Sequence, residues 1–219
     1  MKKKIKMNYY DKSLISLRYW LQGANMHLAL KALEFATKFH VGLRKDGKTK
    51  EFYHQISIIR YLRTLYNHMD FPQETLAVAA LHDVAEDYDV GFEEIGILFG
   101  QQICEAVKVL TKKHRGNKLS NDIYYSNIAE NVIASVVKGA DRINNIQTMM
   151  GVFTYEKQNK YIVETTELVF PMLKKARRKF TTQEPVYENE KLMLQTQLSL
   201  IQEIHRVDQK VTVSEVHGC

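Results

Sequence analysis

Residues 76–87, LAVAALHDVAED, place a histidine and three carboxylates within an aliphatic run. The aliphatic residues predict a buried helix, but burying an unpaired imidazole or carboxylate is strongly unfavourable. A bound cation is the simplest compensation. On a continuous helix His82 and Glu86 lie about one turn apart, and Asp83 and Asp87 have the same spacing. The segment therefore predicts a core helix with a polar stripe that forms one side of a metal site.

Residues elsewhere in the chain extend this predicted metal site. His54 lies upstream, and in KGADRINNIQTMM (138–150) the residues Asp141, Asn145 and Thr148 fall on one side of a helix. Mixed nitrogen and oxygen ligands suit manganese, iron, nickel or zinc better than calcium. The alternative is a structural hydrogen bond at the His-Asp pair, with the following acidic residues as a solvated helix end. The predicted ligands are His54, His82, Asp83 and Asp141.

The composition indicates one compact domain rich in helix. Of 219 residues, 45% are apolar, and only 10 glycines and 3 prolines interrupt them. Cys104 and Cys219 are the two cysteines, so no disulfide framework is expected and the cytoplasm is the expected location. The basic start, MKKKIKMNYYDKS, lacks the apolar stretch of a signal peptide. No run reaches the roughly 18 apolar residues that a membrane-spanning helix needs, so we expect no membrane partner.

The net charge of +6 permits an anionic partner. The basic residues are scattered and no nucleic-acid-binding motif accompanies them, so we expect no sequence-specific nucleic acid.

Helical periodicity covers most of the chain, and no alternating strand pattern competes with it. The fold class we predict is all-α, a helical bundle with an additional C-terminal helix. Asp11 is the expected cap of the first helix, Asp70 and Pro72 mark the start of the helix that carries residues 76–87, and Pro171 is expected to bend a long helix. The expected helices are 14–40, 56–69, 73–87, 92–100, 101–113, 123–130, 132–150, 156–180 and 187–205, with loops at 44–55, 114–121 and 181–185 and a loose tail from residue 208.

Several of these segments carry a family resemblance in their order and spacing. They are ALEFATKFH (32–40), RKDG (44–47), FYHQ (52–55), LAVAALHDVAED (76–87), EEIGILFGQQICEAVKVLT (93–111), VKGADRINNIQTM (137–149) and KYIVETTELVFPML (160–173). Across about residues 25–180, the chain resembles the HD-domain hydrolases of the RelA/SpoT type, including the small alarmone hydrolases. The resemblance implies three parts: residues 1–24 as a basic segment and helix, 25–180 as the HD hydrolase domain, and 181–219 as linker, C-terminal helix and tail.

The resemblance also implies an activity and a set of roles. The activity is removal of the 3′-diphosphate from guanosine tetra- or pentaphosphate, (p)ppGpp, which gives GDP or GTP and pyrophosphate. The four predicted ligands would hold Mn²⁺ or another divalent transition metal, and Glu86 and Asp87 would be the catalytic acidic pair. The implied nucleotide contacts are Arg44, Lys45, Asn145 and Thr148, with Lys138 as a further phosphate contact or an ion-pair partner.

Two other functions stay open at this point. The family's serine in the RKSG motif is Asp46 here, so the substrate is alternatively an adenosine alarmone of the ppApp type, NADPH or a deoxynucleotide. A catalytically silent nucleotide-binding module is the second alternative. The final helix is expected to form an extra layer over the core or a contact between copies in a homo-oligomer.

Overall fold

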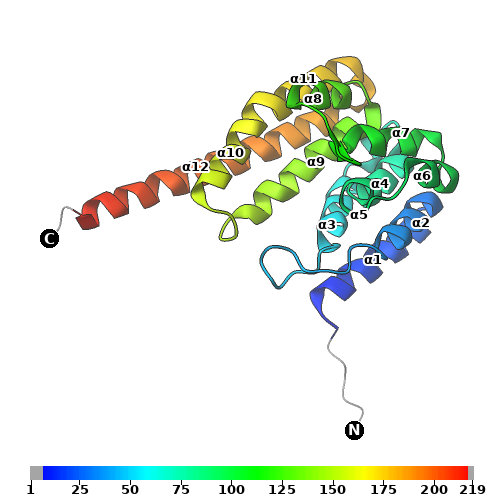
Figure 1. The fold of residues 1–219 in the computed structure, drawn as a ribbon, viewed down its shortest axis with the longest axis horizontal. Coiled ribbons are helices and arrows are strands. Elements are labelled where there is room, and N and C mark those ends of the chain that lie inside the picture. Colours follow the sequence, from blue (N-terminus) through cyan, green and yellow to red (C-terminus); the bar gives the residue numbers. More distant parts are fainter. Residues whose placement is uncertain (1–6, 217–219) are drawn as a thin grey trace, which may run out of the picture.

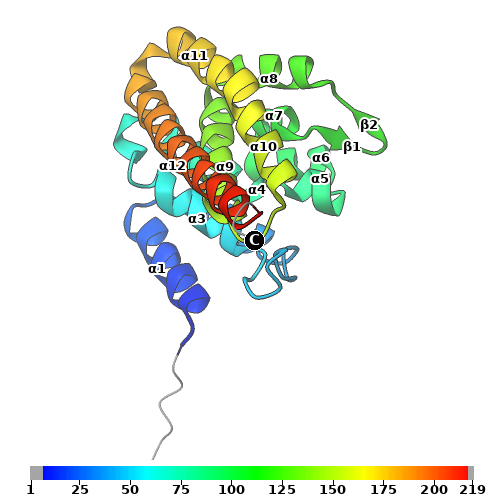
Figure 2. The same cartoon turned by 90° about the vertical axis from the view of Figure 1, so that its left-hand side faces the viewer.

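A computed structural model describes residues 7–216, with side chains described up to residue 207. The basic residues 1–6 and the last three residues, 217–219, lie outside the described residues. The described chain is a helical bundle with one two-stranded hairpin (Figures 1 and 2), so the all-α prediction is confirmed. Its elements are α1 (Tyr9–Gly23), α2 (His27–Ala36), α3 (Tyr53–Leu62), a 3-10 helix (Tyr66–His68), α4 (Pro72–Leu81), α5 (Val84–Tyr88), α6 (Phe92–Phe99), α7 (Gln101–Leu110), β1 (Lys113–His114), β2 (Asn117–Lys118), α8 (Asn121–Ala129), α9 (Val132–Met149), α10 (Tyr155–Glu164), a π-helix (Thr165–Val169), α11 (Phe170–Lys179), a 3-10 helix (Thr181–Gln183) and α12 (Glu184–Val216).

Two helices, α4 and α9, form the centre of the core. Every residue from Thr75 to Leu81 in α4 is buried, which explains its lack of a polar face. In α9 the buried residues include Asp141 and Arg142 as well as aliphatic side chains. Around this pair, α2 and α3 pack on one side and α12 packs along α9 on another (Figure 1). Packing of α9 on several sides therefore fixes the position of its buried polar residues inside the bundle.

The helix predicted over residues 73–87 is interrupted at the His82-Asp83 pair. It ends at Leu81, and α5 begins at Val84. The His82 Nδ1 atom lies 3.0 Å from the carbonyl oxygen of Ala79, an acceptor that the next turn of a continuous helix would use. The prediction of one continuous polar stripe is therefore wrong. Glu86 and Asp87 lie in the first turn of α5 and not at the end of a long helix.

Two predicted helix caps and the predicted end of the first helix are wrong. The first helix is capped by Asn8, whose side chain accepts from the backbone N–H of Asp11, and it ends before Asn25, which has a φ of 57°. Asp70 does not cap α4: its carboxylate accepts from the Thr182 hydroxyl, although Pro72 begins the helix as expected.

The C-terminal helix is longer than predicted. It includes residues 184 and 185, which were assigned to a linker, and its backbone continues to Val216 through the predicted tail.

Residues 113–118 form a hairpin where the end of a helix and a loop were predicted. Its turn residues, Arg115 and Gly116, both have positive φ angles, as the tight two-residue turns of hairpins require. Two other helix ends were predicted correctly: Gly100 ends α6 with a φ of 90°, and the Ser120 side chain caps α8. A π-helix precedes Pro171 at the predicted bend. Within residues 7–216 no helix is long and apolar enough to cross a membrane.

Candidate metal and nucleotide site

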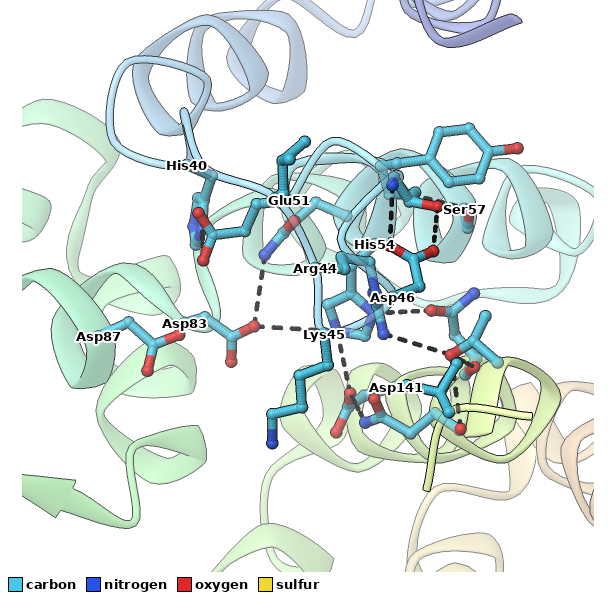
Figure 3. A pocket seen from close by; sticks show the side chains of 18 of the residues that line it. His40, Arg44, Lys45, Asp46, Glu51, His54, Ser57, Asp83, Asp87 and Asp141 are labelled. Atoms are coloured by element: carbon cyan, nitrogen blue, oxygen red, sulfur yellow. Dashed lines mark hydrogen bonds and ion pairs between the residues drawn. The ribbon is translucent and has the colours of Figure 1, made fainter. Parts of the chain in front are cut away.

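A pocket of about 500 Å³ opens beside the break between α4 and α5 (Figure 3). The loop from α2 to α3 forms one wall, and the end of α9, the loop that follows it and Tyr161 of α10 form another. The polar ends of His54, Asp83 and Asp141 line the pocket, so it leads to the predicted metal ligands.

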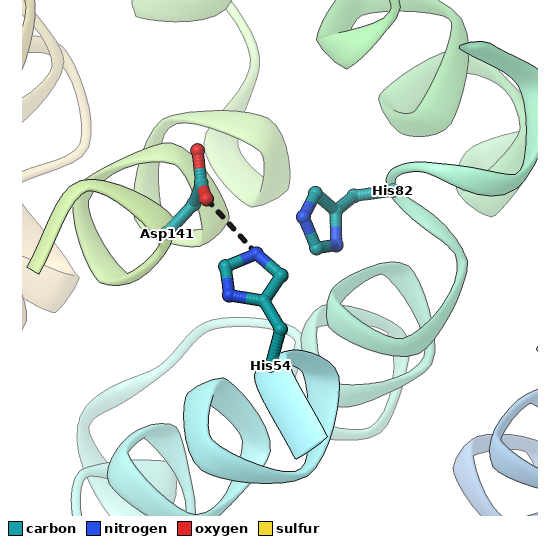
Figure 4. A group of neighbouring side chains, drawn as sticks. All are labelled: His54, His82 and Asp141. Atoms are coloured by element: carbon teal, nitrogen blue, oxygen red, sulfur yellow. Dashed lines mark ion pairs between the residues drawn. The ribbon is translucent and has the colours of Figure 1, made fainter. Parts of the chain in front are cut away.

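Three predicted ligands come together from three separate elements (Figure 4). His54 lies in the first turn of α3, His82 follows α4, and Asp141 lies in the middle of α9; one ligand atom from each lies within 4.8 Å of the others. The His54 Nε2 atom is 3.2 Å from Asp141 Oδ1. The buried His82 Nε2 atom makes no hydrogen bond of acceptable geometry with a described residue, although Asp83 Oδ2 lies 3.0 Å from it. An imidazole nitrogen that faces carboxylates in this way is the arrangement that a divalent cation would satisfy.

Asp83 lies next to this group, with its side chain 33% exposed. Its Oδ2 atom is 3.0 Å from His82 Nε2 and 3.8 Å from His54 Nε2, and it accepts from Gln55 Nε2 at 3.3 Å. Asp83 therefore lies beside the group that His54, His82 and Asp141 form.

The ring orientation of each histidine is fixed from behind. Asn144 Oδ1 lies 2.7 Å from His54 Nδ1, and the Ala79 carbonyl oxygen holds His82 Nδ1. Because both acceptors bind the Nδ1 side, both Nε2 atoms are left facing Asp141 and Asp83. Such outer contacts set the tautomer of metal-binding histidines.

Opposite charges in the site shift several pKa values. Burial alone would raise the pKa of Asp83, but His82 beside it lowers that pKa to about 2. Burial alone would lower the pKa of His82, but Asp83 raises it to about 9. Lys138, 2.9 Å from Asp141 Oδ2, contributes to holding the pKa of Asp141 well below its usual range against the effect of burial. A cation would replace the His82 proton, since a histidine ligand must be neutral.

The structure separates the predicted acidic pair. Asp87 lines the pocket, and burial, assisted by Asp83 and Glu86, raises its pKa to about 6. Glu86 turns away from the pocket: its Oε2 atom accepts from the backbone N–H groups of Lys112 at 2.9 Å and Lys113 at 3.4 Å. Asp87 has the position and the pKa range of a proton-transfer group.

The predicted nucleotide contacts lie mainly around the outer part of the pocket. Arg44 donates to the Thr148 hydroxyl at 3.2 Å, and both line the pocket with Lys45 and Asn145. Asn145 Nδ2 also donates to Asp141 Oδ1 at 2.6 Å. Lys138 is the exception, because its ammonium group lies behind Asp141 and it is not among the lining residues. This is the ion-pair position that the sequence left open for it.

Four further residues that were not predicted lie at the pocket or contact its lining. Phe153 lines it, and the ammonium group of Lys157 lies 3.7 Å from the centre of its ring. Tyr88 donates to Glu51, another lining residue, at 2.7 Å. A single lysine, glutamate or aromatic residue carries no distinctive sequence signal, so only the tertiary arrangement identifies these four.

The fold and site match a known class of protein. Residues 32–179 match the HD domain family, and the chain belongs to that family. It is similar to the guanosine-3′,5′-bis(diphosphate) 3′-pyrophosphohydrolase of Aquifex aeolicus, with 34% identity over 149 residues, 65% of this chain and 20% of that protein. It is also similar to a probable enzyme of the same name from Synechocystis, with 28% identity over 153 residues, 66% of this chain and 20% of that protein. The chain thus spans about a fifth of the length of these relatives.

A solved structure supports the fold assignment. The chain is similar to a metazoan ortholog of SpoT that is described as hydrolysing ppGpp, with a TM-score of 0.56 and 23% identity. The likeness covers 74% of this chain and 94% of that protein. This likeness supports the fold expected from the resemblance found in the sequence.

Proposed function

We propose that the protein is a metal-dependent phosphohydrolase that removes the 3′-diphosphate from (p)ppGpp, giving GDP or GTP and pyrophosphate. The observation that carries the proposal is the grouping of two histidines and two aspartates at the inner end of a pocket whose outer wall carries Arg44 and Lys45. The names of the Aquifex and Synechocystis relatives support the choice of substrate.

We propose His54, His82, Asp83 and Asp141 as the metal ligands, with Mn²⁺ as the metal. When bound, the cation supplies charge neutralisation and Lewis acidity at the phosphoryl group. The donor set of imidazole nitrogens and carboxylate oxygens fits a divalent transition metal. Lys138 then acts on the substrate only through Asp141, whose charge it compensates from behind.

The proton transfers are assigned to Asp87. Attack of water on the nearer phosphorus of the 3′-diphosphate forms one P–O bond and breaks the bond to the ribose 3′-oxygen. Asp87, with a pKa of about 6, accepts the proton of the water and returns a proton to the departing 3′-oxygen. Glu86 holds the start of the hairpin beside α5 and is proposed as a positioning residue.

The remaining lining residues bind the nucleotide. A guanidinium group stacks on a purine and binds phosphate in a fork, which suits Arg44 to either role. Thr148 fixes the Arg44 side chain, while Asn145 links the nucleotide side of the pocket to Asp141. Lys45 and Lys157 both lie over the ring of Phe153, so two positive charges meet at this wall and favour a polyphosphate.

We also propose the broader assignments made from the sequence. Residues 25–180 form the hydrolase domain, residues 181–219 append a helix to it, and the protein is cytoplasmic. On α12, Met193, Leu200 and Val207 are exposed at intervals of seven residues, which supports a helix contact between two copies. The molar mass in solution of the protein and of its Leu200→Glu variant tests this contact.

The decisive experiment is manganese-dependent release of pyrophosphate from (p)ppGpp, run beside adenosine alarmones, NADPH and deoxynucleotides. We expect turnover of the guanosine alarmones that disappears on metal removal and in Asp83→Asn. Metal content and thermal stability of Asp83→Asn show whether the variant lost the metal or the fold. Turnover of a different nucleotide alone would replace the substrate, and absence of any metal-dependent turnover would favour the silent binding module.

A further inference from the structure

The wall of the pocket formed by residues 150–154 is a short loop between α9 and α10. Val152 and Phe153 line the pocket from this loop. The ring of Phe153 is flanked by two ammonium groups, Lys157 at 3.7 Å and Lys45 at 5.4 Å from its centre. The position of the Phe153 ring therefore affects where both ammonium groups lie.

This loop is held from behind by a buried amide. Gln158 is 7% exposed, and its Nε2 atom donates to the backbone carbonyl of Phe153 at 2.8 Å. A carbonyl only accepts, so this contact fixes which end of the amide faces the loop. The Oε1 atom of Gln158 must then face away from the pocket.

The partner of that Oε1 atom comes from the C-terminal helix. His205 Nε2 lies 2.7 Å from Gln158 Oε1, and because the amide oxygen only accepts, His205 Nε2 carries the hydrogen. His205 is 8% exposed, and its ring lies 4.5 Å from that of Tyr155 at the start of α10. A continuous chain of hydrogen bonds thus runs from α12 to the backbone of the pocket wall.

The position of His205 on α12 makes this contact distinct from ordinary core packing. Residues from Val186 to Ile201 bury apolar side chains of the helix. His205 follows one turn later and contacts Gln158 and Tyr155 of α10. Beyond it α12 continues past the bundle (Figure 1). His205 is the most C-terminal buried side chain among the described residues.

We propose that His205 is a positioning residue that holds the nucleotide-binding wall through Gln158, so that the C-terminal helix sets the affinity of the pocket for nucleotide. The role in binding rests on the proposed function. The hydrogen-bonded link between α12 and residues 150–154 does not, and it is tested separately.

The first variant is His205→Ala, which removes the donor to Gln158. Amide hydrogen exchange across residues 150–158 should accelerate, because the wall loses its support from behind. The KM for (p)ppGpp should rise about fivefold, the value of one hydrogen bond, with kcat little changed. His205 contacts neither the metal-ligand group nor Asp87, which is why the effect should be confined to KM.

Three further variants separate positioning from general damage. His205→Gln supplies a donor amide at the same place and should restore both readouts. Gln158→Glu keeps an acceptor for His205 but removes the donor to Phe153, so it should behave like His205→Ala. Gln202→Ala, an exposed position one turn earlier on α12, is the matched control and should resemble the wild type.

The two readouts distinguish the possible failures. If the wild type turns over no nucleotide, the proposed function fails, while faster exchange of residues 150–158 in His205→Ala and Gln158→Glu still supports the link. Unchanged exchange in both variants overturns the proposal, as does a KM effect in Gln202→Ala equal to that in His205→Ala. A loss of kcat with unchanged KM would also overturn it.

Discussion

Asp46 uses both of its carboxylate oxygens inside its own loop. Its Oδ1 atom accepts from the backbone N–H groups of Lys48 at 2.9 Å and Thr49 at 2.8 Å, and its Oδ2 atom accepts from the Thr49 hydroxyl. The Thr49 hydrogen bonds lower the pKa of Asp46 to about 2. The sequence suggested that this residue changes the substrate base, whereas its contacts are those of a residue that shapes the loop carrying Arg44 and Lys45.

We therefore predict that Asp46→Ser leaves the base preference unchanged. A serine hydroxyl retains part of the turn, so the ratio of kcat/KM for guanosine and adenosine alarmones should stay within about twofold of the wild type. Asp46→Ala, which cannot make the turn, is the comparison and should raise KM for both nucleotides together. A tenfold change of the ratio in Asp46→Ser would assign the carboxylate to base recognition after all.

Glu86 and Asp87 are adjacent but should respond differently to loss of charge. Asp87→Asn removes the group facing the pocket, and kcat should fall roughly 10²- to 10⁴-fold with the fold intact. Glu86→Gln keeps an oxygen that accepts from the Lys112 N–H, so most of kcat should remain. Steady-state kinetics and the thermal midpoint of both variants measure this difference. The reverse ranking would make Glu86 the proton-transfer group.

At the scale of elements, the sequence predicted the composition of the site better than its geometry. A histidine or carboxylate in an apolar stretch of sequence is unusual, so each candidate ligand could be identified from its own surroundings. The interruption after Leu81 could not be predicted, because the apolar periodicity continues through it and the competing contact of His82 with Ala79 depends on a rotamer. Asn144, which orients His54, was also missed as a functional residue, since an amide on a helix has no distinctive pattern.

The contact between α9 and α12 gives a prediction at the same scale. Gly139 lies where an added Cβ would overlap the carboxylate of Glu190 on α12. Gly139→Ala should therefore destabilise the protein by about 1–3 kcal/mol through overpacking, although alanine is the better helix former by about 1 kcal/mol. Chemical denaturation measures the change. Glu190→Ala removes the carboxylate that the added Cβ would overlap, so Gly139→Ala should cost little stability in a protein that already carries Glu190→Ala. If the two substitutions destabilise the protein additively, this account is contradicted.

Across the whole molecule, α12 connects the core to the proposed site. Its first half packs against α9 and α11, and its second half reaches Gln158 behind the pocket wall. The sequence predicted an amphipathic final helix, but the span of that helix and its link to the pocket could not be predicted, because they depend on where a long helix lies on the bundle. Glu190 lies in the buried part of this helix, with neither carboxylate oxygen hydrogen-bonded to any described residue.

The buried Glu190 should make the stability of the whole protein depend on pH. Burial raises its pKa well above the usual range, so the folded state retains a proton that the unfolded chain releases above a pH of about 4.3. The contribution of Glu190 to stability is therefore complete below that pH and is lost as the pH rises towards the folded-state pKa.

The variant Glu190→Gln, which cannot ionise, should not show this loss of stability. The free energy of unfolding of both proteins is measured by denaturation from pH 4 to pH 8. The difference between Glu190→Gln and the wild type should grow in favour of the variant by at most roughly 1.4 kcal/mol per pH unit. Glu188 is half-buried and ion-paired with Arg177, so its charged form is stabilised, and Glu188→Gln should show no such gain. A constant difference between Glu190→Gln and the wild type over this range would mean that Glu190 ionises as readily in the folded protein as in the unfolded chain.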